Sequence, residues 1–253
     1  MRPTPPYRVF IGWDAAEMQA HLVAQWSMKL HASQALDIHR LSMSNLQASG
    51  LYTRETTVRQ IDGRPVLWDV RSEAPMTTGH AIARFFVPDL CHHEGWALFT
   101  DGDILVRSDL SRLFALADPQ YAVMVVKHPP LLETGVKKDG LPQTSYERKN
   151  WSSVMLFNCA HPANAERLTL KTLNMWPGRD LHRFLWLEND QIGELPAEWN
   201  HLVGVSADVP DEQIAIAHYT LGTPSVVGHE CDRFAEDWFL TAKAAGYKRE
   251  AVA

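Results

Sequence analysis

The sequence is poor in cysteine, in long apolar runs and in positive charge. Its three cysteines, Cys91, Cys159 and Cys231, lie far apart and form no Cys-x-x-Cys pair. This argues against a disulfide framework or a zinc knuckle and fits a reducing compartment. No stretch approaches the roughly 18 unbroken apolar residues of a membrane span, and the first residues contain no apolar run of signal-peptide length. We therefore expect a cytoplasmic protein.

Acidic residues outnumber basic ones. The 253 residues include 24 Lys and Arg against 30 Asp and Glu, a net charge of -6, which argues against a general nucleic-acid binder. Hydrophobic residues make up 45% and charged residues 21% of the chain, as is ordinary for a globular enzyme. An anionic substrate would need local cations or a metal ion to offset the acidic background.

Apolar segments and helical patterns alternate along the chain, without an internal repeat. We expect strands at residues 7–12, 35–43, 96–101, 121–126, 152–158 and 214–219, and two more around the Asp62-Gly63 turn. We expect helices at residues 13–33, 77–90, 108–116, 162–175 and 234–247. The alternation predicts one α/β domain, residues 1–253, with a mostly parallel central sheet flanked by helices. Such sheets bind ligands at the carboxyl ends of their strands.

Local signals indicate where the helices begin and end. Asp14 and Glu17 resemble a capping box, Ser108 is expected to cap the helix at 108–116, and Pro88 is expected to stop the helix at 77–90. A helical stripe is predicted from apolar residues that recur every four positions, which are Met18, Leu22, Trp26 and Leu30.

Two acids end the buried strand in "LFTDGDILV". Asp101 and Asp103 flank Gly102, and two carboxylates this close are costly to desolvate unless a cation or hydrogen bonds compensate. One reading is an acid-lined turn, since Asp and Gly are common turn residues. The other is a site for Mg²⁺ or Mn²⁺, which prefer carboxylate and phosphate oxygens. His218 ends another apolar strand and would complete an Asp/Asp/His metal site if the two strand ends meet.

Six segments, in order, resemble a known enzyme family. They are "RVFIGWD", "HAIARFF", "LFTDGDILVRSDLSRLF", "KNWSSVMLFN", "ENDQIGELPAEWN" and "IAHYTLGTP". Together they resemble the GT-A glycosyltransferases, most closely the retaining family 8 type, which includes lipopolysaccharide sugar transferases and glycogenin-like enzymes. The resemblance covers most of the chain and implies a Rossmann-like GT-A fold.

The resemblance assigns roles to individual residues. Asp101 and Asp103 match the DxD motif that holds Mn²⁺ or Mg²⁺ on the nucleotide diphosphate, and His218 matches a third metal ligand. Asp190 and Gln191 match an Asp-Gln pair beside the anomeric carbon of the sugar, and are the expected catalytic residues.

Further residues match positions that contact the donor. Asp14 matches a residue that contacts the nucleotide base, Arg84 an arginine that reaches the donor, and Gly222 a glycine on the diphosphate. Trp151, Ser152 and Ser153 stand where the family has an Asn-Ala-Gly that contacts the donor sugar, and Trp151 and Ser152 are the expected donor contacts. Each has a plainer structural interpretation, such as a helix cap for Asp14 and a core aromatic for Trp151.

The sequence also departs from the family. The usual His-x-x-Gly-x-x-Lys-Pro-Trp is reduced to His218-Tyr-Thr-Leu-Gly222-Thr-Pro224, without the lysine that neutralises the diphosphate. Lys137, Lys138 or Lys149 would have to substitute. The chain is therefore identified as a divergent branch, and the sugar is not carried over.

The resemblance implies transfer of a sugar, with retention, from a nucleotide diphosphate sugar, expected to be a UDP-sugar. The acceptor would be a hydroxyl of a glycan, a lipid-linked glycan or a protein, as in lipopolysaccharide biosynthesis. The long loop at residues 127–150 would close over the donor as a lid. Peripheral contact of the last helix with the inner face of the membrane is an alternative to plain packing.

Three other functions compete with this interpretation. A haloacid-dehalogenase-like phosphatase would have Gly-Thr after its DxD and, later, a lysine and an acidic pair, but Ile104-Leu105 follow the DxD here and the chain contains no Asp-Asp dipeptide. A nucleotidyltransferase would have a glycine-rich, basic loop after its first strand, where this chain has "GWDAAEMQ". A non-catalytic sugar-nucleotide or glycan-binding protein on the same fold stays open, because the lysine and the Asn-Ala-Gly are missing.

Overall fold

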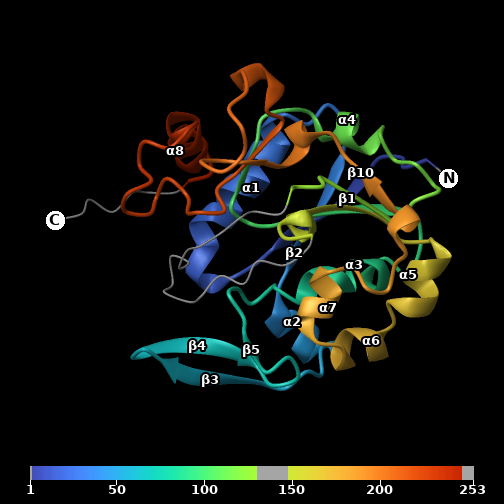
Figure 1. The fold of residues 1–253 in the computed structure, drawn as a ribbon. Helices are drawn as coiled ribbons and strands as arrows, with labels where there is room; N and C mark the ends of the chain where they lie inside the picture. The colour runs from blue at the N-terminus through green and yellow to red at the C-terminus, as the bar shows by residue number, and fades with distance from the viewer. Residues whose placement is uncertain (1, 130–147, 247–253) are drawn as a thin grey trace.

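The computed structural model describes residues 2–129 and 148–246 and is built around a six-stranded sheet (Figure 1). Its strands, in spatial order, are β10 (Ile192–Glu194), β8 (Val123–Val125), β9 (Val154–Asn158), β6 (Trp96–Thr100), β1 (Tyr7–Gly12) and β2 (Leu36–Leu41). β9 runs antiparallel to both of its neighbours, and the other pairs are parallel. The expected mixed, mostly parallel sheet is confirmed.

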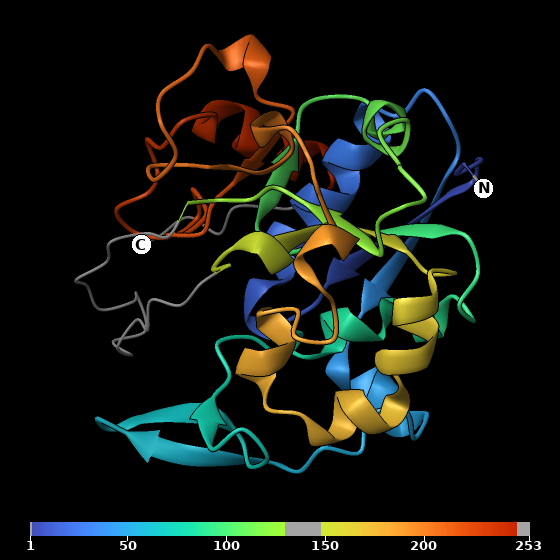
Figure 2. The same ribbon diagram turned by 45° about the vertical axis from the view of Figure 1, so that its right-hand side comes forward.

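Helices cover both faces of this sheet, which explains why its central strands are apolar on both sides. One face packs against α1 (Met18–Leu30) and α4 (Leu110–Phe114). The opposite face is covered by shorter helices, and Figure 2 shows them together below the sheet. They are α3 (Val87–Leu90), α5 (Pro162–Arg167), α6 (Leu170–Met175) and α7 (Gly178–His182).

Two small sheets flank the central one. The first consists of β11 (His201–Leu202), β12 (Ile216–His218) and β7 (Ile104–Val106). It pairs the segment that follows Asp103 with the segment that precedes Tyr219. The second, β3 (Thr56–Ile61), β4 (Arg64–Asp69) and β5 (Ala74–Pro75), projects from the body as a hairpin. Its turn has positive φ at Asp62 and Gly63, as the Asp-Gly pair predicts. The remaining helices are α2 (Met43–Ala48) and α8 (Ala235–Ala244), and α8 packs against α1.

Several local expectations were wrong. Pro88 lies in the first turn of α3, where a missing N–H costs nothing, and so does not stop a helix. Asp109, not Ser108, caps α4 by accepting from the Ser111 N–H. The helix expected at residues 162–175 is two helices, because Thr169 caps a new one.

The first helix also differs in detail. The expected stripe lies toward solvent, with Met18 51% and Leu30 58% exposed, and Val23, Ala24 and Met28 form the buried face instead. Asp14 caps the short 3₁₀ helix η1 (Ala15–Glu17) without a capping box.

Candidate metal centre and donor site

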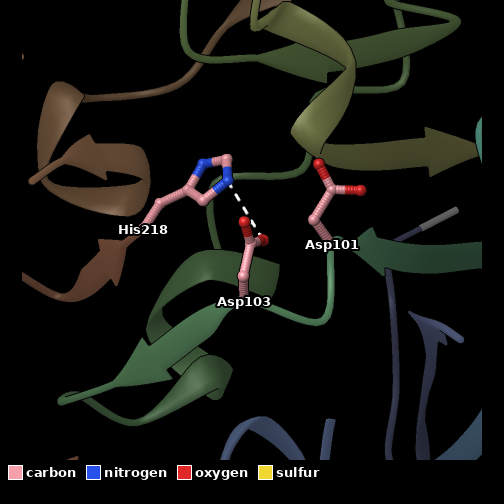
Figure 3. Close-up of side chains that lie close together, drawn as sticks. All are labelled: Asp101, Asp103 and His218. Atoms are coloured by element: carbon pink, nitrogen blue, oxygen red, sulfur yellow. Dashed lines mark ion pairs between the residues drawn. The ribbon is translucent and has the colours of Figure 1, made fainter. Parts of the chain in front are cut away.

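The acidic turn lies where two sheets meet. β6 ends at Thr100, and β7 begins at Ile104, directly opposite His218 of β12. The Tyr219 N–H donates to the Asp103 carbonyl at 2.9 Å. This antiparallel pairing brings Asp101, Asp103 and His218 together, with one ligand atom of each within 4.8 Å of the others (Figure 3). The expectation that the two strand ends meet is thereby confirmed.

A glycine separates the two acids because there is no space for a side chain. A Cβ at Gly102 would lie 2.9 Å from the carbonyl oxygen of Gly12, at the end of β1. A Cβ at Gly12 would lie 2.4 Å from the ring of His80. The ends of β1 and β6 are therefore in direct contact, and the acidic turn lies against His21 of α1.

The side chains of Arg84 and His80 hold the Asp101 carboxylate. Arg84 reaches it with Nη2 to Oδ1 at 2.9 Å and Nη1 to Oδ2 at 3.3 Å, and His80 Nε2 donates to Oδ1 at 3.1 Å. Arg84 also donates to the Ser152 carbonyl at 2.8 Å. Burial favours the neutral acid, but Arg84 and His80 outweigh it and hold the pKa of Asp101 well below its usual range. This carboxylate is therefore ionised and fixed in orientation.

A chain of hydrogen bonds orients His218. Asn200 Nδ2 donates to Ser153 Oγ at 2.9 Å, and Ser153 Oγ donates to the Asn150 carbonyl at 2.7 Å. The amide oxygen of Asn200 therefore faces His218 Nδ1, 2.9 Å away, and can only accept. Nδ1 must carry the hydrogen, so in the neutral ring Nε2 has a free lone pair.

That lone pair faces a carboxylate. His218 Nε2 lies 3.2 Å from Asp103 Oδ1, and this buried oxygen has no hydrogen-bond partner among the described residues. Burial lowers the pKa of His218, but the Asp103 carboxylate more than compensates and raises it. Two acceptors this close need a cation between them, either a proton or a metal ion. Two carboxylates and an imidazole fit Mn²⁺ or Mg²⁺, and the Asn200 contact is the kind of support that metal-binding histidines have.

Further carboxylates lie beside this cluster. Asp14 accepts from the Ala16 N–H at 2.9 Å and from the Gly79 N–H at 2.7 Å, which fixes it at the carboxyl end of β1. Burial and the nearby charges of Asp103, Asp101 and Asp14 raise the pKa of Glu17 to about 8. The carboxyl edge of the sheet therefore gathers four acidic side chains, of which Glu17 retains its proton near pH 7.

The other residues expected to contact the sugar donor lie in different surroundings. Trp151 begins the 3₁₀ helix η3 (Trp151–Ser153), and its Nε1 donates to the His128 carbonyl at 2.9 Å. Ser152 Oγ lies 2.8 Å from His182 Nδ1. Gly222 has φ of 141°, a conformation that favours glycine, four residues after His218. Lys149 is buried close to η3.

Asp190 and Gln191 are not brought to the cluster. They immediately precede β10, which is parallel to β8 and therefore to β6, so they lie at the opposite edge of the sheet. The Ala122 N–H donates to the Gln191 carbonyl at 2.9 Å at this far edge, and the Gln191 side chain forms a capping box with Glu188. β10 is also three strands away from β6, or about 14 Å at the usual strand spacing.

Sequence reasoning missed His80, Asn200, Glu17 and His128. His80 lies four residues before Arg84, a spacing that places two side chains on one side of a helical turn and could have signalled the shared contact with Asp101. Asn200 carries no local signal, because only the folding of distant strands brings it to His218. His128 follows the apolar strand expected at 121–126, the same kind of strand-end position that singled out His218. The lid expected at residues 127–150, with Lys137 and Lys138, lies largely outside the described residues.

Two surface cavities lie elsewhere, against α8. One of about 330 Å³ is lined by Arg107, Asp237 and Leu240 among others, and one of about 430 Å³ by acidic residues around Asp232. Neither includes the cluster. The candidate centre is identified by its side-chain geometry.

No family profile matches the chain. It is 36% identical to Protein CDI of Arabidopsis thaliana over 236 residues, which cover 92% of this chain and 85% of that protein. The chain belongs to the Protein CDI family. Because the match spans nearly all of both chains, membership applies to the whole α/β unit, including the elements that carry Asp101, Asp103 and His218.

Solved structures show which fold this CDI-family member has. The galactosyltransferase LgtC, in complex with donor and acceptor sugar analogues, superposes with a TM-score of 0.56 at 15% identity, covering 96% of this chain and 98% of LgtC. GlyE of Streptococcus pneumoniae superposes at 0.59 with 19% identity, and the bifunctional WbbM at 0.59 with 16%. These two matches span 93% and 95% of this chain, but only 60% of GlyE and 51% of WbbM. The fold is that of GT-A glycosyltransferases.

Among the described residues, no helix is both long and apolar enough to cross a membrane.

Proposed function

We propose that this CDI-family protein is a metal-dependent glycosyltransferase that moves a sugar from a UDP-sugar to an acceptor hydroxyl. The observation that carries the proposal is the Asp103–His218 pair, in which a buried carboxylate oxygen faces an imidazole nitrogen at 3.2 Å and has no other polar partner among the described residues. The pair lies at the carboxyl edge of a GT-A sheet, where such folds bind ligands. The Asp-Gly-Asp motif in the same turn supports this assignment.

Asp103 and His218 would hold the cation, with Asp101 beside them in an orientation fixed by Arg84 and His80. When bound, the cation supplies positive charge to the diphosphate and stabilises it as the leaving group. The chain's own contribution is to fix the ligands before binding, so that little reorganisation is needed during the reaction. Asp14, already fixed by two backbone N–H groups, would contact the base at the end of β1.

The motif order resembles that of retaining enzymes, so we propose retention. The acceptor would be a hydroxyl of a glycan, a lipid-linked glycan or a protein. Asp190 and Gln191 are not assigned to the reaction, because the structure separates them from the cluster by the width of three strands.

That separation favours a second candidate function. A protein that binds a UDP-sugar without transferring the sugar would keep the metal cluster and would not need the Asp-Gln pair at the anomeric carbon. Turnover separates the two functions. Release of UDP from a panel of UDP-sugars, alone and with glycan acceptors, supports the transferase, and binding without release supports the second candidate.

The primary test is calorimetric titration of UDP in Mn²⁺ and then in EDTA. We expect binding in Mn²⁺ alone, and loss of more than about 100-fold in affinity for Asp103→Asn, because removing a ligand should cost more than removing a supporting contact. Asp109→Asn is the matched control, since it makes the same charge change at a helix cap where Asn serves equally. Unaltered UDP binding by Asp103→Asn in Mn²⁺ would refute the site.

A further inference from the structure

His128 lies at the same edge of the sheet as the metal cluster. It follows β8, which is antiparallel to β9, and β9 is antiparallel to β6. β8 and β6 therefore run in the same direction, and His128 and Asp101 both follow carboxyl ends. The two strands are separated only by β9, or by about 10 Å.

The imidazole of His128 is buried without being used by the fold. The residue is only 9% exposed, and no described residue hydrogen-bonds to its Nε2. A buried polar atom without a partner costs about 1–3 kcal/mol, and such atoms in native proteins call for a functional explanation. His128 is close enough to His218 and His201 for their charges to interact with it, and burial lowers its pKa to about 4. The ring is therefore neutral near pH 7.

The order of the strands indicates which part of a donor would reach His128. Asp14, proposed to contact the base, follows β1 on one side of β6, and His128 follows β8 on the other side. With the base at β1 and the diphosphate at the metal cluster, the transferred sugar extends over β9 and β8. Trp151, which donates to the His128 carbonyl, precedes β9 at this same place.

We propose that His128 determines donor specificity by hydrogen-bonding a hydroxyl of the transferred sugar. A neutral imidazole has one donor and one acceptor nitrogen, as a sugar hydroxyl both donates and accepts. The inference rests on the proposed function, because the metal cluster sets the position of the diphosphate. It gives His128 a role on the sugar and none on the nucleotide.

Two variants test this role. His128→Leu has similar size and no hydrogen-bonding group, and His128→Gln keeps an amide near the position of Nε2. The probes are UDP, UDP-glucose and UDP-galactose, titrated calorimetrically in Mn²⁺, and the quantity compared is the Kd of the UDP-sugar divided by that of UDP. For the UDP-sugar that the parent protein prefers, we expect His128→Leu to raise this ratio about 3- to 10-fold, the effect of one neutral hydrogen bond. The Gln variant should recover part of the loss.

The outcomes separate this inference from the proposed function. His128→Leu should bind UDP as the parent does and have an equal or higher Tm, because it removes an unpartnered buried polar group. A parent-like ratio, or an equal loss of UDP and UDP-sugar binding, overturns the role on the sugar and leaves the metal site intact. Absence of metal-dependent UDP binding by the parent overturns both.

Discussion

Replacing Glu17 by Gln should change how the stability of the metal-free protein depends on pH. Burial and the charges of Asp103, Asp101 and Asp14 raise the pKa of Glu17 from 4.5 to about 8. The folded protein therefore retains a proton that the unfolded chain has lost. Its stabilising contribution is fully present below about pH 4.5 and is lost as the pH rises through about 8. Stability should fall with rising pH in this window.

The size of the effect follows from the linkage relation. Between pH 7 and pH 8.5, a group with a folded pKa of about 8 loses about 1 kcal/mol, and less where solvent screens it. For a chain of 253 residues, this corresponds to a change in Tm of roughly 2–4 °C. Comparing Glu17→Gln with the parent cancels the histidines and other groups that titrate in both proteins.

The assay is thermal and urea unfolding in EDTA at pH 7 and pH 8.5. We expect the parent to lose more stability than Glu17→Gln between the two values. Mn²⁺ should reduce this difference, because positive charge at the cluster offsets the repulsion that keeps Glu17 protonated. An identical pH dependence of parent and variant in EDTA would refute the placement of Glu17 beside the acidic cluster.

Two more substitutions test how the cluster is supported. Arg84→Met should lower the unfolding free energy by about 2 kcal/mol, below the 3–5 kcal/mol typical of a broken buried pair, because Asp101 keeps His80 and some exposure. In urea unfolding, the same change should cost clearly less in an Asp101→Asn background, and equal costs would contradict the pairing. Asn200→Leu should weaken Mn²⁺ binding about 10- to 100-fold by freeing His218 to rotate, as an electron paramagnetic resonance titration of Mn²⁺ would measure. Unchanged Mn²⁺ affinity would mean that Asn200 does not orient the ligand.

β6 and β9 could be predicted because both are short apolar runs with local signals. The acidic turn with Asp101 and Asp103 directly follows β6. From the sequence, we could say only that Asp103 and His218 would share a metal site if their two strand ends met. The pairing that brings them together joins β7 and β12 across more than a hundred residues, and β7 itself, only three residues long, is too short to give a periodic pattern.

The positions of residues that were assigned by the order of motifs along the chain, such as Asp190 and Gln191, were harder to predict. Gln191 directly precedes Ile192, the first residue of β10, so no segment remains to carry the Asp-Gln pair across to the acidic edge. The order of the motifs along the chain is the same whether or not such a segment is present. The edge of the sheet at which the Asp-Gln pair lies is not. His80 and Asn200 were missed for another reason. Each is a buried polar residue whose partner comes from a distant strand end, and only His80 had a sequence signal, its spacing of four residues from Arg84.

The reversed direction of β9 has a consequence for how the site could diverge. Because β9 runs opposite to β8, the chain leaves the sheet after Val125 and returns at Val154 on the same edge as the metal cluster. The last residues of this connection support the metal cluster, because the Ser152 carbonyl accepts from Arg84 and Ser153 Oγ accepts from Asn200. Exchange of the connection would keep the cluster only if residues 150–153 were retained. Under the proposed function, substrate range would therefore diverge here by changes that precede Asn150, since connections between strands tolerate change more readily than the strands themselves.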